Sequence, residues 1–277
     1  MTDAASDNSP VFLRQQELRD LVFGSTRLWS DLTVVAETGS TNEDLVAAAR
    51  AGTPEGRVLV AERQVRGRGR LGRSWVSEPG ASLTFSVLLR PTAVPQVARG
   101  WLPLLTGVAV AAGVRAETGL DVGLKWPNDV LASTGAASGA KLAGILAEQA
   151  GDAIVVGTGL NVATSPDDLP QAAATSLAEL GAGDVDREAL LATILREFER
   201  FYLRWAGGDA PGDAALSGLR DQYLQLCTTV GQDVRVEVPG GLYLSGRACD
   251  VDDIGRLLVA SAEGVEPVSA GDVIHVR

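Results

Sequence analysis

The longest uncharged, mostly apolar run in the chain extends from Trp101 to Val114. It is too short to cross a membrane, which takes about 20 apolar residues, and it is typical of a helix buried in a core. Short β-patterned runs lie on both sides of it, at 32–37, 58–64, 82–90, 122–126, 142–149 and 154–162. A buried helix among such strands predicts an α+β or α/β domain built on one large sheet.

Further helices are expected around these strands. One lies at about 11–23, and another ends at Arg50 after a capping box in which Ser40 is the N-cap and Glu43 stands three residues on. A third begins after Asp186. Its apolar stripe is predicted to face the core and consists of Leu191, Leu195, Phe198, Tyr202 and Trp205.

The C-terminal part of the chain has a different pattern. After a composition break at 206–215 and a helix near 216–226, short glycine-punctuated β runs follow at 234–238, 242–249, 257–260 and 273–276. They predict a small all-β domain of about 50 residues, in the form of a small barrel. We therefore expect two domains, 1–220 and 221–277, with a disordered tail at 1–10.

Acidic residues outnumber basic ones by 35 to 24, which gives a net charge of −11. This negative field disfavours non-specific binding to nucleic acid or to an anionic membrane. Two cysteines, Cys227 and Cys249, are too few for a disulfide scaffold, and no basic-then-apolar secretory signal opens the chain. These features predict a cytoplasmic protein without nucleic-acid or membrane partners.

The segment 67–73 holds three glycines and three arginines. Glycines let backbone N–H groups approach a ligand, and arginines complement phosphate or carboxylate oxygens. The segment therefore predicts a lid over an anionic ligand, although a solvated hairpin or a small nucleic-acid patch would have the same composition. Ordering seven residues costs on the order of 10 kcal/mol, so we expect disorder until the ligand binds. Mutual repulsion among five neighbouring arginines is expected to favour the disordered state further. They are Arg63, Arg66, Arg68, Arg70 and Arg73.

Only two of the 24 basic residues are lysines, Lys125 and Lys141. A codon bias toward arginine would explain this low share of lysine. The alternative is that both positions need a compact ammonium group in place of a guanidinium. Lys125 opens the sequence Lys-Trp-Pro-Asn-Asp at 125–129, predicted to be a strand end and turn. The ammonium of Lys125, the amide of Asn128 and the carboxylate of Asp129 suit an anion-binding site, with or without a metal. The alternative is a turn whose Trp126 and Pro127 have a purely structural role.

Several familiar chemistries are excluded. The segment before Lys141 is an incomplete P-loop, because Ala140 replaces a required glycine and no Ser or Thr follows the lysine. The glycine-rich segment 155–162 lacks the dinucleotide fingerprint. The only histidine, His275, lies near the C-terminus, which excludes Ser-His-Asp and Cys-His catalysis, and we interpret it as a structural strand residue. Any chemistry must rest on charges and hydrogen bonds.

Six motifs follow one another along the chain: Gly-Ser-Thr-Asn at 39–42, Gln64, 67–75, 125–129, 141–146 and 157–162. In this order they closely resemble the biotin protein ligases, over nearly the whole chain. The resemblance implies an α+β fold, in which a large mixed-sheet catalytic domain of the class II synthetase-like or biotin–lipoate ligase-like type is followed by a small SH3-like β-barrel. It also implies that biotin and MgATP form biotinyl-5′-AMP, from which biotin passes to a lysine of a biotin carboxyl carrier domain of an acyl-CoA or pyruvate carboxylase.

The resemblance also assigns roles. The residues implied to bind biotin are Ser40, Thr41, Asn42, Gln64, Arg68, Gly69, Arg70 and Lys125. Those implied to bind ATP or the adenylate are Arg68, Trp75, Lys141 and Asn161, with Asp129 as the candidate for Mg2+. Lys125 and Arg70 are the implied catalytic pair: Lys125 bridges the biotin carboxylate and the α-phosphate, and Arg70 belongs to the lid.

Two competing interpretations and two departures from the family accompany this assignment. A lipoate or octanoate enzyme has a similar fold, but an octanoyltransferase needs a catalytic cysteine and both cysteines lie outside the motif region. A nucleic-acid-binding module is disfavoured by the negative net charge.

Only 36 residues precede Glu37, so we expect the ligase-only class that does not bind DNA, as a monomer or weak homodimer. The insertion at 132–139 is expected to be a flexible hairpin tip.

Overall fold

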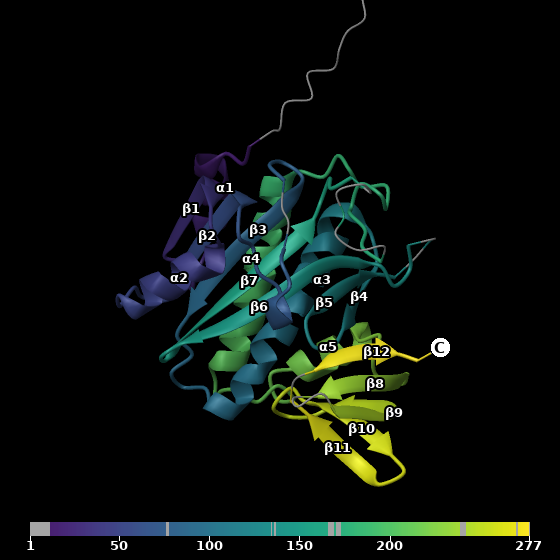
Figure 1. Ribbon diagram of the computed structural model, residues 1–277. Helices are drawn as coiled ribbons and strands as arrows, with labels where there is room; N and C mark the ends of the chain where they lie inside the picture. The colour runs from purple at the N-terminus through teal and green to yellow at the C-terminus, as the bar shows by residue number, and fades with distance from the viewer. Residues whose placement is uncertain are drawn as a thin grey trace, which may run out of the picture.

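The computed structural model describes residues 12–75, 78–133, 135, 137–165, 169, 173–238, 242–269 and 271–276. The predicted tail at 1–10 lies outside these residues. Two sheets organise the described chain, a seven-stranded sheet in the first part and a five-stranded sheet at the C-terminus (Figure 1). This confirms the α+β class with a separate C-terminal sheet.

The large sheet has the strand order β1-β2-β3-β7-β6-β5-β4. Its strands are β1 (Asp31–Thr38), β2 (Arg57–Gln64), β3 (Ser82–Leu89), β4 (Val122–Lys125), β5 (Asp129–Ala132), β6 (Lys141–Ala150) and β7 (Ala153–Asn161). β1 and β2 run parallel because helix α2 (Thr41–Arg50) crosses over between them, and the other described neighbours are antiparallel. The sheet is therefore mixed, as predicted.

Helices cover both faces of this sheet. On one face lies the main core, with α3 (Trp101–Thr118) and α4 (Arg187–Ala206) packed so closely that a Cβ on Gly113 would lie 2.4 Å from Ile194 Cγ1. Helix α1 (Gln15–Phe23) packs on α4. Helix α2 covers the other face and contacts β3, β7 and β6 through a smaller apolar cluster. The opposite placement of α2 leaves its N-terminal end beside the sheet centre.

Two helix predictions are confirmed in detail. Helix α3 and the turn before it are long and apolar enough to cross a membrane by length and composition, yet 72% of an apolar 18-residue window in this stretch is buried inside the protein. It is the core helix expected from the uncharged run. Asp186 caps α4 by accepting a hydrogen bond from the Ala189 N–H, and the predicted apolar stripe of α4 is buried.

The C-terminal sheet follows α5 (Leu219–Leu226) and has the order β11-β10-β9-β8-β12, with antiparallel neighbours throughout. Its strands are β8 (Asp233–Val238), β9 (Leu242–Val251), β10 (Leu257–Ser261), β11 (Gly264–Val268) and β12 (Asp272–His275). Two core indoles reach its β9–β10 turn, where Trp101 donates to Asp253 O at 2.9 Å and Trp126 donates to Gly255 O at 3.0 Å. The second sheet is thus held against helix α3 and the turn after β4, and it lies below β4 and α5 in Figure 1.

Two short strands differ from prediction. Asp129 was expected in a turn but begins β5, which forms a hairpin with β4 in which Lys125 faces Asp129. β11 was not expected at all. Four- and five-residue strands give too few alternations to show in a sequence, and β11 also contains Pro267, which favours an edge position.

Candidate functional site

A pocket lies on the α2 side of the large sheet, at the centre of its β3, β6 and β7 strands. It is enclosed by the N-terminal end of α2 and by the segment 67–75. Its lining is formed by Ser40, Thr41, Asn42, Gln64, Arg68, Gly69, Arg70, Arg73, Ser74, Trp75, Thr84, Asn128, Asp129, Lys141, Gly144, Ile145, Leu146, Gly157, Thr158, Gly159, Asn161 and Ala174. Every site residue predicted from the sequence except Lys125 belongs to this lining.

Glycines form the floor of the pocket. A Cβ on Gly159 would lie 2.2 Å from Trp75 Cε2, and one on Gly144 would lie 3.2 Å from Trp75 Cζ3. The Trp75 ring therefore rests on strands that carry no side chain at these points. Its indole Nε1 is buried and has no hydrogen-bond partner among the described residues. An orphaned buried donor in a pocket is a sign of a polar ligand.

The N-terminal end of α2 carries a connected polar network. Thr41 donates to Gln64 Oε1 from its backbone N at 2.8 Å and from its hydroxyl at 3.0 Å. Ser86 Oγ lies 2.7 Å from both Thr41 Oγ1 and Asn42 Oδ1, and Asn42 donates to Glu148 Oε2 at 2.8 Å. Two predicted residues, Thr41 and Asn42, are thereby fixed by Ser86 and Glu148, two partners that the motifs did not reveal.

The predicted capping box at α2 is wrong in its hydrogen bonds. Ser40 does occupy the N-cap position in extended backbone, but its side chain makes no capping bond within the described chain. Gln64 takes over part of this task, because its amide oxygen accepts from the Thr41 N–H. Glu43, the expected partner of Ser40, turns toward the arginine segment instead.

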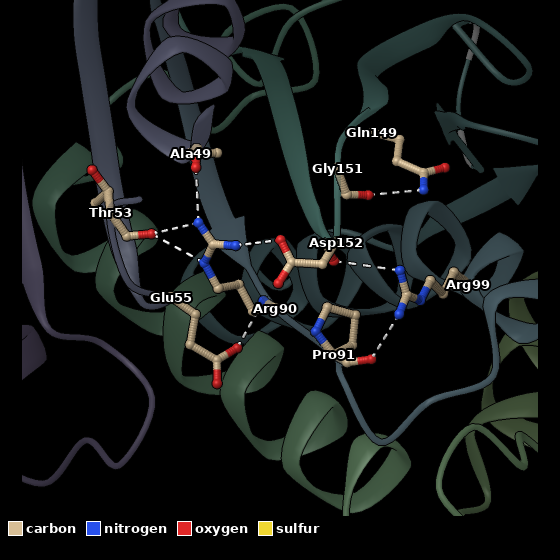
Figure 2. A network of polar contacts seen from close by, with 9 residues as sticks. All are labelled: Ala49, Thr53, Glu55, Arg90, Pro91, Arg99, Gln149, Gly151 and Asp152. Carbon is tan, nitrogen blue, oxygen red and sulfur yellow. Dashed lines mark hydrogen bonds and ion pairs between the residues drawn. The ribbon is translucent and has the colours of Figure 1, made fainter. Parts of the chain in front are cut away.

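Arg90 holds the opposite end of α2 (Figure 2). Its guanidinium donates to Ala49 O at 2.9 Å and to Thr53 O at 2.9 and 3.1 Å, and it pairs with Asp152 at 2.5 Å. The Arg90 backbone N–H donates to Glu55 at 2.9 Å. Ala49 O also accepts from the Gly52 N–H at 3.1 Å, and Arg90 adds a charged donor at this end of the helix that brings Thr41 and Asn42 to the pocket.

Replacing Arg90 by alanine is expected to lower the free energy of unfolding by about 1–3 kcal/mol, because two carbonyls, Ala49 O and Thr53 O, lose a charged donor. Chemical denaturation measures this. Arg99→Ala is the matched control, since its guanidinium makes only longer contacts of 3.2 to 3.4 Å in the same network. An equal loss in both variants would contradict the role given to Arg90.

The arginine segment forms a tight turn. A 3-10 turn spans Arg70–Gly72, and Arg68 pairs with Ser74 as an isolated β-bridge. Arg70 donates to Asn128 Oδ1 at 3.0 Å and to Gly271 O at 3.4 Å. The segment thus contacts the turn after Lys125 and the C-terminal sheet at once.

Acidic residues from other elements face the arginines, whose mutual repulsion was expected from the sequence. Glu43 of α2 pairs with Arg68 and lies 3.8 Å from Arg66, and Glu37 of β1 pairs with Arg63 at 3.1 Å. These partners could not be recognised from the sequence, because helix α2 and strand β1 come close to the arginine segment only in the folded protein. Repulsion among the arginines is therefore partly offset without any ligand.

Ligand-dependent ordering of the segment stays a prediction. Protease is expected to cut within 67–73 in the free protein, and biotin with ATP is expected to block the cut by neutralising the arginines. Time courses of limited proteolysis with and without the two compounds measure this. Equal cleavage rates under both conditions would rule out ordering by the ligand.

Lys141 and Asp129 form an ion pair in the pocket wall, with Nζ and Oδ1 2.6 Å apart. The Lys141 ammonium also lies 5.9 Å from the centre of the Trp75 ring. No cluster of three His, Cys, Asp or Glu side chains suited to a metal occurs in the described part of the chain. Mg2+ that arrives with ATP needs only one or two protein carboxylates besides phosphate oxygens, so Asp129 fits as such a ligand.

Lys125 does not belong to the pocket lining formed by the described residues. It ends β4 at the sheet edge, directly opposite Asp129, and opposed residues of an antiparallel pair share a face of the sheet. Lys125 therefore lies on the pocket face, one strand beyond the wall. A four-carbon stem gives its ammonium the reach to enter.

The C-terminal sheet secures this strand end. Thr229 is wholly buried, and its hydroxyl oxygen accepts a hydrogen bond from the Trp126 N–H at 3.0 Å and lies 3.3 Å from His275 Nε2. Burial, and next the charge of Lys125, lower the pKa of His275. The interpretation of His275 as a strand residue is confirmed, and the residue also connects the two sheets.

Stability is expected to fall as the pH drops below about 6.5, the ordinary pKa of histidine. His275 titrates lower in the folded protein, so the unfolded chain binds more protons in this range and unfolding is favoured. Unfolding free energies at pH 7.5 and 5.5 measure the effect. The pH dependence is expected to shrink in His275→Gln, and an unchanged slope would contradict the assignment.

Comparison with known proteins identifies the family. Residues 36–163 match the biotin/lipoate A/B protein ligase family, and residues 229–276 match the biotin protein ligase C-terminal domain. The chain is 43% identical over 281 residues to the biotin--[acetyl-CoA-carboxylase] ligase of Mycobacterium tuberculosis, covering 100% of both chains. The bifunctional ligase/repressor BirA of Bacillus subtilis is 31% identical over 264 residues, which are 92% of this chain and 76% of that protein.

A solved structure agrees with these relatives. The biotin protein ligase from Aquifex aeolicus in complex with biotin and ATP superposes with a TM-score of 0.72 at 28% identity, covering 90% of this chain and 100% of that one. The chain therefore belongs to the biotin/lipoate A/B protein ligase family.

Proposed function

We propose that this chain is an ATP-dependent biotin protein ligase whose reaction takes place in the pocket on the α2 side of the large sheet. The Mycobacterium tuberculosis ligase matches the whole of this chain, and the Aquifex aeolicus ligase solved with biotin and ATP covers 90% of it. We choose this pocket because of the residues that line it. Glycines lie under Trp75, polar side chains lie at the N-terminal end of α2, and the arginines of the segment 67–73 lie at the opening.

The first step joins biotin to AMP. A carboxylate oxygen of biotin attacks the α-phosphorus of MgATP, an O–P bond forms, and pyrophosphate leaves. Both reacting groups are anionic, so the main task of the protein is to hold them together and to neutralise their charge. We assign this task to Lys125, with the lid arginines Arg68 and Arg70 closing over the carboxylate and phosphate.

The second step transfers biotin to an acceptor. The amine of a carrier lysine attacks the acyl carbon of biotinyl-5′-AMP, a C–N bond forms with loss of a proton, and AMP leaves with the C–O bond electrons. No side chain of this enzyme is bonded to the intermediate in either step. The acceptor is proposed to be a biotin carboxyl carrier domain of an acyl-CoA or pyruvate carboxylase.

The remaining pocket residues are assigned to the other groups of biotin and ATP. The network of Thr41, Asn42 and Gln64 at the N-terminal end of α2 suits the ureido head of biotin, which offers one carbonyl and two N–H groups. Ser40 lines the pocket beside this network and is assigned to the same group. Gly69 allows close approach of the lid backbone. Adenine is proposed to stack on Trp75 near Asn161, whose amide is held by Thr175 O at 3.0 Å. Lys141 is assigned to the phosphates and Asp129 to Mg2+.

The organisation around the pocket is also proposed. We place the domain boundary at 220/221 and expect the C-terminal sheet to close into an SH3-like barrel. The protein is proposed to act in the cytoplasm as a monomer or weak homodimer of the ligase-only class, without DNA or membrane partners. The contacts of Thr229 and Gly271 with the first domain support a part for the C-terminal sheet in holding the site.

Calorimetry tests the substrate. Biotin is expected to bind, and its affinity is expected to rise when a non-hydrolysable ATP analogue is present, because the two ligands share the lid. Lipoate and octanoate, the substrates of related enzymes, are the comparison. Tighter binding of either one than of biotin would overturn the assignment.

A further inference from the structure

Glu43 faces the arginine segment and not the pocket. It lies in the first turn of α2, directly after Thr41 and Asn42, and does not belong to the pocket lining formed by the described residues. Its carboxylate pairs with Arg68 through one oxygen and lies 3.8 Å from Arg66 through the other. The Glu43 side chain is 29% exposed, against 55% for Arg68.

From this geometry we infer that Glu43 is a positioning residue, which holds Arg68 over the pocket and so couples the arginine segment to the α2 end that receives biotin. The inference rests on the proposed role of Arg68 in the lid. Glu43 touches neither substrate in this account. It acts through Arg68 alone.

The physical reason is the entropy of ordering the segment. A glycine-rich segment loses much conformational freedom when it closes, and a contact that already restrains it reduces what the ligand must supply. Arg68 has a planar fork with several donors, so one edge can remain on Glu43 while another faces a ligand oxygen. An ion pair that is partly exposed contributes little to global stability, so its effect is expected on the segment and not on the fold.

A purely local role for Glu43 makes a different prediction. A carboxylate in the first turn of a helix interacts favourably with the helix dipole, whatever lies opposite it. That contribution would be lost in a Glu43 variant whether or not Arg68 is present. Dependence on Arg68 therefore separates positioning from helix stabilisation.

The experiment combines Glu43→Gln, Arg68→Ala and the double variant. Glu37→Gln is the matched control, because it also removes a carboxylate that pairs with an arginine of this region, Arg63, but outside the pocket. One readout is the dissociation rate of preformed biotinyl-5′-AMP, and the other is the rate at which trypsin cuts after Arg70 in the free protein.

We expect Glu43→Gln to raise both rates about fivefold and Glu37→Gln to leave them unchanged. Arg68→Ala is expected to raise the dissociation rate further, and the double variant is expected to match Arg68→Ala. Glu43→Asp, which keeps the charge, is expected to retain most of the parental behaviour.

The inference is overturned if Glu43→Gln behaves like Glu37→Gln, or if its effect adds fully to that of Arg68→Ala. Failure of the proposed function looks different, because the parent itself would then form no biotinyl-5′-AMP. In that case the cleavage rates of the Glu43 and Glu37 variants still decide whether Glu43 restrains the segment.

Discussion

Replacing Lys125 by alanine is expected to slow formation of biotinyl-5′-AMP by about 100- to 1000-fold, the usual loss when one charge-stabilising donor is removed from a reaction centre. Two unit charges 4 Å apart interact by about 4 kcal/mol at an effective dielectric of 20, which is enough for such a factor. The fold is expected to survive, because Lys125 lies at the edge of the sheet with an incompletely buried side chain. Pyrophosphate release in a single turnover measures the rate.

The matched control is Lys141→Ala. Lys141 already lines the pocket beside Asp129, whereas Lys125 must reach in from the neighbouring strand. We expect the smaller loss from Lys141→Ala, because Lys125 alone is assigned to both reacting anions. Near-normal pyrophosphate release in Lys125→Ala, together with a large loss in Lys141→Ala, would transfer the catalytic role to Lys141.

Replacing Arg70 by glycine is expected to release the adenylate about 100-fold faster. The variant loses the cation proposed to face the carboxylate and phosphate, and it loses the contacts that tie the lid to Asn128 Oδ1 and Gly271 O. Glycine also adds conformational freedom to the open segment, which opposes closure. Release of labelled biotinyl-5′-AMP from the preformed complex measures the rate.

Arg63→Ala serves as the control for Arg70→Gly, because it removes an arginine of the same cluster that pairs with Glu37 outside the pocket. Its adenylate is expected to dissociate at the parental rate. If Arg70→Gly retains the intermediate as tightly as Arg63→Ala does, Arg70 is not part of the lid.

Periodicity and capping predicted the larger elements well. Helix α3 begins at Trp101, where the uncharged apolar run begins, and extends past the end of that run to Thr118. The run predicted a buried helix because its apolar side chains lie on all sides of the helix. Asp186 begins α4 as expected, since a cap depends only on the next three residues. Every site residue assigned from the motifs except Lys125 lines the pocket.

The network around the predicted residues could not be predicted. Ser86 and Glu148 hold Asn42 from strands β3 and β6, 44 and 106 residues away in the sequence, and each resembles an ordinary strand residue there. The same applies to Glu43, whose spacing from Ser40 predicted a capping bond, while the fold gives it an arginine partner. Such contacts depend on sheet order and register, which a single sequence does not determine.

Lys125 shows the same dependence. Its position relative to the pocket follows from β5, a four-residue strand that places Lys125 one strand beyond the wall. With 125–129 interpreted as a strand end and turn, nothing in the sequence indicated that separation.

A crystal structure with biotin and a non-hydrolysable ATP analogue tests the central claim most directly. We predict biotin in the pocket with its ureido group at Thr41 and its carboxylate within hydrogen-bond distance of Lys125 Nζ. Biotin bound away from both the arginine segment and Lys125 would contradict the account.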